Sequence, residues 1–163
     1  MNNKLIFEMA KYYEEQPERI QHYIKVFTYA KILGEEEKLS PETQHILETA
    51  AIVHDIGIKA SEAKYGDLLG KHQEELGPAI AEDMLAKLGY DKKVIERVSY
   101  LVAHHHTYNA IDGLDYQILV EADFLVNIHE NYNPYSSAAE AYKKIFKTEA
   151  GKRLYKIMYG IKE

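Results

Sequence analysis

Apolar residues recur every three to four positions along almost the whole chain, a spacing that predicts amphipathic α-helices. The glycine-containing segments 56–75 and 108–114 lack this spacing, so we expect loops there, the first with one short turn. No segment alternates long enough to indicate a sheet. The pattern therefore predicts an all-α globular bundle of about seven or eight helices. These helices are expected at residues 3–15, 17–34, 41–54, 78–88, 91–103, 116–130, 135–147 and 149–159.

Composition narrows the class of protein. A length of 163 residues suits one domain, which we place at 1–163, with the last two helices (about 135–160) as an outer pair. The net charge is −6 and basic residues are scattered, which argues against binding to duplex nucleic acid. There is no cysteine, so neither disulfides nor thiolate metal ligands are available. No signal-peptide pattern and no apolar run of ~18 residues is found, so we expect no membrane contact and a cytoplasmic location.

The strongest chemical feature is the pair His54-Asp55, at the end of an apolar helix and just before Gly57. An imidazole and a carboxylate in a core need partners, and a divalent cation satisfies both. His22 and Asp123 lie on separate apolar helices and complete a set of metal-ligand types. Alternatives remain for each: a half-buried His22 bonded to a carbonyl, Asp55 only orienting His54, or Asp123 exposed on a polar face.

The order His22, His54-Asp55, Asp123 resembles the signature of the HD-domain superfamily of metal-dependent phosphohydrolases. The similarity extends over residues 20–130 and includes HDIG after one helix and EADFLVN on a later one. This resemblance implies a helical HD-like fold with one or two divalent metals at its centre. It also implies a small phosphorylated substrate, often a nucleotide.

The proposed ligand set leaves open positions for water and a phosphate oxygen. Mixed nitrogen and oxygen ligands suit Mn, Fe, Co, Ni or Zn, and suit Mg less well. A bound cation polarises the phosphate and lowers the pKa of bound water, and Asp55 is a candidate to hold a proton during attack.

The expected number of metals depends on which histidines lie between the His54-Asp55 pair and Asp123. Dinuclear relatives commonly have a histidine four positions before a glycine; here that position, before Gly77, is Gln73, and His72 is one residue away. One metal is therefore expected rather than two. His104, His105 and His106 end the helix that precedes the second loop, and His105 lies nearest the centre of its apolar stripe. We expect His105 to face the pocket, as a metal ligand, a phosphate contact or an acid for the leaving group, with a solvated helix end as the alternative. His72, His104 and His106 are candidates for a second metal or the pocket.

Other candidates are weaker. Lys59 follows the His-Asp pair and is a candidate phosphate contact and catalytic residue, or simply a solvated loop lysine. Glu74 and Glu75, and Tyr108 and Asn109 at the mouth, are further candidates with equally plain structural explanations.

The leading hypothesis is a phosphohydrolase. The alternatives are a non-catalytic metal- or nucleotide-binding module, a di-iron oxygenase-type relative, and a protein-interaction scaffold. The C-terminal helices either cap the core or form a homo-oligomer surface.

Overall fold

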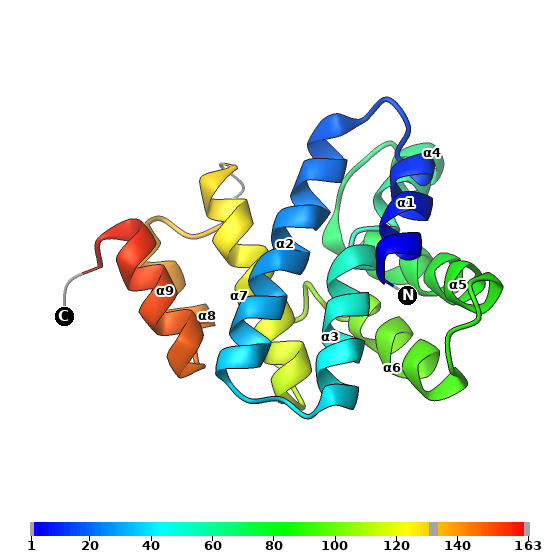
Figure 1. Ribbon diagram of the computed structural model, residues 1–163. Helices are drawn as coiled ribbons and strands as arrows, with labels where there is room; N and C mark the ends of the chain where they lie inside the picture. The colour runs from blue at the N-terminus through cyan, green and yellow to red at the C-terminus, as the bar shows by residue number, and fades with distance from the viewer. Residues whose placement is uncertain (1, 131–133, 162–163) are drawn as a thin grey trace.

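The computed structural model describes residues 2–130 and 134–161, and within them the chain is helical without strands. The all-α prediction is confirmed, with nine helices among these described residues where seven or eight were expected (Figure 1). The helices are α1 (Asn2–Tyr12), α2 (Pro17–Glu36), α3 (Pro41–Val53), α4 (Ile58–Tyr65), α5 (Gly70–Lys87), α6 (Lys92–Val102), α7 (Leu114–His129), α8 (Ala138–Ile145) and α9 (Glu149–Tyr159).

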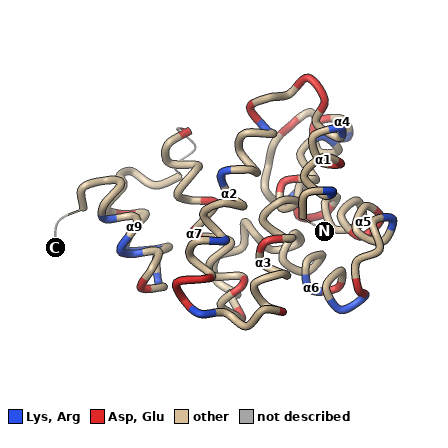
Figure 2. The backbone as a smooth tube through the Cα atoms, viewed as in Figure 1, with Lys and Arg blue, Asp and Glu red and all other residues tan. Residues whose placement is uncertain are grey.

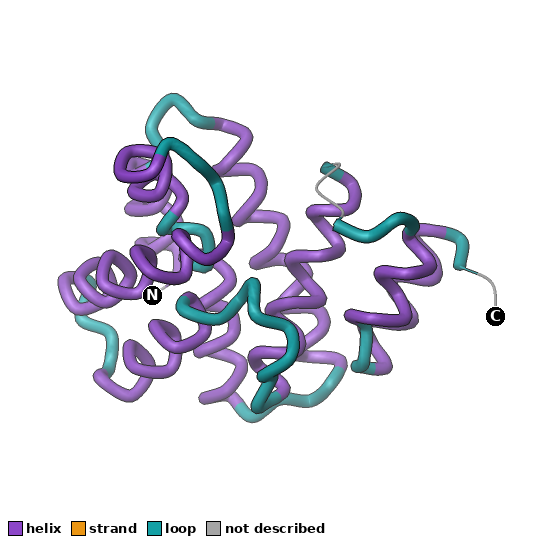
Figure 3. The backbone as a smooth tube through the Cα atoms, turned by 180° about the vertical axis from the view of Figure 1, so that it is seen from behind, coloured by secondary structure: helices purple, strands orange, loops and turns teal. Residues whose placement is uncertain are grey.

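Helices α2, α3 and α7 pack against one another and form the centre of the bundle. Helix α7 is buried on nearly all sides, since every residue from 115 to 126 is buried, as expected for a helix surrounded by others. Helix α1 covers α3, the pair α5–α6 packs beside α3, and α8–α9 lie on the other side of α7 (Figure 1). Seen from behind, a long loop between α6 and α7 crosses the face of the bundle (Figure 3). The ends of α3 and α6 and the middle of α7 thereby face a common space.

One buried carboxylate attaches the C-terminal pair of helices to α7. Glu121 is fully buried and accepts hydrogen bonds from the backbone N–H groups of Lys147 (2.6 Å) and Thr148 (2.9 Å), in the link between α8 and α9. It also accepts from Gln117 Nε2 at 2.7 Å. Burial raises the pKa of Glu121, although these hydrogen bonds oppose the shift.

The segment 56–75 differs from its prediction as a loop, because α4 and the start of α5 lie within it. Helix α5 begins at Gly70, so Pro78 lies inside the helix and does not open it. The glycines misled the prediction because they serve close packing. A Cβ on Gly77 would lie 2.8 Å from Val102 Cγ1, and one on Gly57 would lie 2.5 Å from Gln73 O. Gly34 likewise lies inside α2, against α3, and does not end the helix.

Acidic and basic residues are interspersed along the backbone, and the described part of the chain has no long basic stretch (Figure 2). None of the described helices combines the length and apolarity that crossing a bilayer requires.

Candidate metal centre

Four side chains from three parts of the bundle meet in its interior. Helix α2 supplies His22, the turn after α3 supplies His54 and Asp55, and the middle of α7 supplies Asp123. His22 Nε2 lies 3.3 Å from His54 Nε2, 3.3 Å from Asp55 Oδ2 and 3.2 Å from Asp123 Oδ1. His54 Nε2 lies 3.4 Å from Asp55 Oδ2 and 3.5 Å from Asp123 Oδ1. The helix end lets the neighbouring His54 and Asp55 turn toward the same point.

These separations fit donors around one ion. Two donors that each bind a first-row divalent metal at about 2.1 Å lie about 3.0 to 3.4 Å apart, at octahedral or tetrahedral angles. Asp123 is only 3% exposed, and its Oδ1 makes no hydrogen bond despite lying close to two imidazoles. A buried oxygen left without a hydrogen bond is costly, and a cation between the donors removes this cost. The residues present therefore fit a divalent metal.

The histidine rings are held by their other nitrogen. His54 Nδ1 donates to Ala51 O at 2.9 Å, and His105 Nδ1 donates to Val102 O at 2.9 Å, in each case three residues back at a helix end. His22 Nδ1 donates to the carboxylate of Glu130 at 2.8 Å. Because Nδ1 carries the proton, Nε2 of each neutral ring presents a lone pair to the centre. Metal-binding histidines are usually oriented in this way.

Electrostatics in the metal-free protein follow from this crowding. Burial lowers the pKa of His22, but contacts with Asp123 and Asp55 outweigh burial and raise it to about 9. His54 is fully buried, yet Asp55 and Asp123 raise its pKa well above the usual value. Burial raises the pKa of both aspartates, but the imidazoles outweigh it and hold each pKa well below its usual range. Protons therefore occupy the site in competition with a metal.

A second group of donors adjoins the first through Asp55. Donor atoms of Asp55, His105 and His106 lie within 4.8 Å of one another, and Asp55 Oδ1 is 3.5 Å from His105 Nε2. His105 is 2% exposed, and its Nε2 has no hydrogen-bond partner. His106 Nε2 contacts Gln73 Oε1 at 3.1 Å. Burial and the neighbouring His105 lower the pKa of His106 to about 4, so this ring is neutral at pH 7.

Three residues named from the sequence lie outside both groups. Lys59 Nζ donates to Tyr12 O at 3.0 Å, so the lysine turns toward α1 and not toward the aspartates. His72 Nδ1 pairs with Asp67 at 2.8 Å, because its position on α5 points it toward the loop 66–69. His104 Nδ1 donates to Tyr100 O at 2.7 Å, and its ring stacks on Tyr100. The structure therefore gives no geometric support for the expected roles of these three residues.

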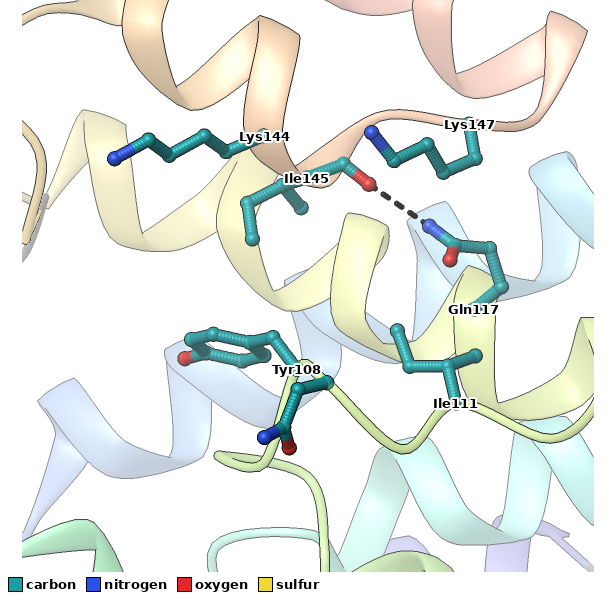
Figure 4. A pocket seen from close by; sticks show the side chains of 7 residues that line it. Tyr108, Ile111, Gln117, Lys144, Ile145 and Lys147 are labelled. Atoms are coloured by element: carbon teal, nitrogen blue, oxygen red, sulfur yellow. Dashed lines mark hydrogen bonds between the residues drawn. The ribbon is translucent and has the colours of Figure 1, made fainter.

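The remaining candidates have structural contacts. Glu74 accepts from His106 N at 2.9 Å and from the Thr107 hydroxyl at 3.0 Å, which ties α5 to the loop after α6. Glu75 lies further out, with Lys64 and Tyr65. Tyr108 and Asn109 line a cavity of about 190 Å³ between this loop, α7 and the end of α8 (Figure 4). Tyr108 also packs edge-on against Phe124, with ring centroids 5.3 Å apart.

Two residues near the centre were not identified from the sequence. Glu130, which contacts His22, follows Asp123 by seven residues, two helical turns, and so shares its side of α7. That spacing was an available signal. Gln73 was noted only as a missing histidine, and its contact with His106 depends on how α5 packs beside α6.

The HD domain family model matches residues 19–145, and the chain belongs to this family. The resemblance stated from the sequence is thus confirmed. A solved structure, a predicted HD superfamily hydrolase from an uncultured Thermotogales bacterium, is similar with a TM-score of 0.69 and 23% identity. The match covers 97% of this chain and 84% of that chain, and it supports the fold. No curated protein matches the chain.

Proposed function

We propose that the protein is a metal-dependent phosphohydrolase that acts on a small phosphate ester or nucleotide. Membership of the HD family and the geometry of the site support this proposal. The observation that carries it is the buried Asp123 oxygen, which lies without a hydrogen bond 3.2 Å from His22 and 3.5 Å from His54. Such a group is costly in a core but suits a cation site.

His22, His54, Asp55 and Asp123 would hold the ion. When bound, a divalent metal polarises a phosphate oxygen and lowers the pKa of a bound water. The chain's own groups then position and move protons. Asp55 Oδ1 faces His105 Nε2 at 3.5 Å, so the two groups can hold a proton between them. Because Val102 O fixes Nδ1 of His105, any proton that this ring gives to a leaving group departs from Nε2.

We retain one metal as the expected number, and a dinuclear centre as the second candidate. The observation that favours the second candidate is the group of Asp55, His105 and His106 beside the first set. A dinuclear site can also hydrolyse phosphate esters, whereas a di-iron, oxygenase-type site would serve oxidation. Metal content distinguishes one metal from two, and the oxygenase-type site requires two equivalents of a redox-active metal.

The test is elemental analysis of the purified protein together with a panel of phosphate esters and nucleotides. The parent should retain a divalent metal and hydrolyse at least one substrate. Because Asp55 faces both groups of donors, Asp55→Ala should lose both metal and activity. Its helical circular dichroism should match that of the parent. Asp83→Ala is the matched control, since Asp83 is exposed and pairs with Lys87 at 2.5 Å, within the same helix. Unchanged metal content in Asp55→Ala would refute the ligand assignment, and metal without turnover would favour a binding module.

A further inference from the structure

Glu130 connects a surface lysine to a residue of the metal centre. It is the first residue after α7, and its two oxygens have different partners. Oε2 accepts from His22 Nδ1 at 2.8 Å, and Oε1 accepts from Lys25 Nζ at 2.6 Å. The side chains become more exposed along this series, from 11% for His22 to 20% for Glu130 and 39% for Lys25.

His22 needs this partner for a reason that does not apply to the other histidines. His54 and His105 follow the last residues of their helices, where each Nδ1 reaches a backbone carbonyl three residues back. His22 lies inside α2, where the carbonyls of the preceding turn accept from backbone N–H groups of the helix. A partner for its Nδ1 must therefore come from another element, and the end of α7 supplies it.

We propose that Glu130 is a positioning residue that fixes the tautomer and orientation of His22, and that Lys25 holds Glu130 in place. A carboxylate acceptor keeps the proton on Nδ1 and directs the Nε2 lone pair at the centre, 3.2 Å from Asp123 Oδ1. It also makes the imidazole a stronger ligand than a carbonyl acceptor does. The ammonium of Lys25 offsets the charge of Glu130, so this support adds no net charge beside the two aspartates. This inference rests on the proposed metal site.

A purely structural role for Glu130 is a weaker explanation of these contacts. Helices α2 and α7 already pack together extensively, and both contribute buried apolar residues to the core, such as Val26 and Val126. Ion pairs that are partly exposed contribute little to stability. Removing Glu130 should therefore affect the metal site more than the fold.

The test measures binding of Co²⁺ to the metal-stripped full chain, by isothermal titration calorimetry and by the visible absorption of the bound ion. Glu130→Ala should weaken Co²⁺ binding by about 10- to 100-fold, as is typical for loss of such a partner. Glu130→Gln keeps an acceptor oxygen but loses the charge, so the loss should be smaller, about several-fold. In the Zn²⁺-loaded parent, ¹⁵N NMR should show His22 with its proton on Nδ1, and Glu130→Ala should lose this signature.

The matched control is Glu62→Ala. Glu62 also pairs with a basic residue of α2, Arg19 at 2.7 Å, but contacts none of the metal donors. It should bind Co²⁺ as the parent does. Parent-like affinity in both Glu130 variants, or an equal loss in Glu62→Ala, would overturn the inference. If Glu130→Ala does not fold, the affinity of Glu130→Gln decides. A parent chain that binds no metal would instead contradict the proposed function itself, so the two failures are distinguishable.

Discussion

Replacing Gly57 by alanine tests whether close backbone packing sets the geometry of the site. Gly57 has φ −73° and ψ −16°, which alanine adopts freely, so the change adds only a methyl group. That methyl would lie 2.5 Å from Gln73 O, and 3.0 Å from both Gln73 Cα and Gly77 N. All three atoms belong to the backbone of α5, which cannot move aside as a flexible side chain does.

The magnitude follows from the distance. Ordinary contacts begin at 3.4 Å, so α5 must shift by about 0.9 Å relative to the turn that carries Asp55. Overpacking of this kind costs about 1–3 kcal/mol, against a gain of about 0.5–1 kcal/mol from removing a glycine. We expect a net loss of about 1 kcal/mol, which for a domain of this size lowers Tm by about 2–4 °C. Co²⁺ affinity should also fall, because this shift strains the turn that carries the proposed ligands His54 and Asp55.

The assay is thermal and urea unfolding of the metal-free chain, followed by Co²⁺ titration. Gly66→Ala is the control: Gly66 has φ +70° with no atom within 4 Å of an added Cβ. Alanine there should cost about 1 kcal/mol of backbone strain and leave Co²⁺ affinity unchanged. A Gly57→Ala protein with the Tm and metal affinity of the parent would refute this account of the packing.

Three further predictions concern the site and its support. Because contacts with the aspartates raise the pKa of His22 to about 9, His22 is protonated below that pH and a metal must displace the proton. The pKa of His54 is raised as well, so metal affinity, measured by chelator competition, should increase by about tenfold to a hundredfold per unit between pH 6 and 8; a flat profile would contradict this. His105→Ala should reduce turnover far more than binding of the first metal, whereas His104→Ala should do neither, and equal rates in all three proteins would remove His105 from the site. Glu121→Ala should lower the free energy of unfolding by about 3 kcal/mol in urea, since it leaves buried N–H groups unpaired, while Glu121→Gln keeps an accepting carbonyl and should be tolerated; equal stability of the two variants would argue against this role.

The periodicity of apolar residues was sufficient to predict the all-α fold class, because almost every helix exposes one polar face and buries one apolar face. It failed at residues 56–75, where glycine was taken as a loop former. Gly57 and Gly77 are instead small residues at a helix crossing, and only the packing of α5 on its neighbours shows this. A contact between elements distant in sequence leaves no local pattern to detect.

The candidate metal ligands were recognisable because carboxylates and imidazoles on apolar helices conflict with burial unless they have partners. Lys59 illustrates the limit of such reasoning. Its spacing from Asp55 was compatible with the site, but the direction of α4 turns it toward Tyr12. Glu130 is the opposite case, a supporting residue that the sequence does not reveal. An acid at a helix end has no evident role until the structure places α2 and His22 beside it.

His54 and His105 share a local arrangement whose consequence extends beyond this chain. Each ring is tethered to the main chain of its own final turn, by an atom that no mutation of a neighbouring side chain can delete. Substitutions around these two positions should therefore leave the orientation of both rings unchanged, provided that the helical turn is kept. The orientation of His22 instead depends on a carboxylate from another helix, Glu130. In relatives that lack this carboxylate, His22 should be the first of these histidines to bind a metal ion less tightly.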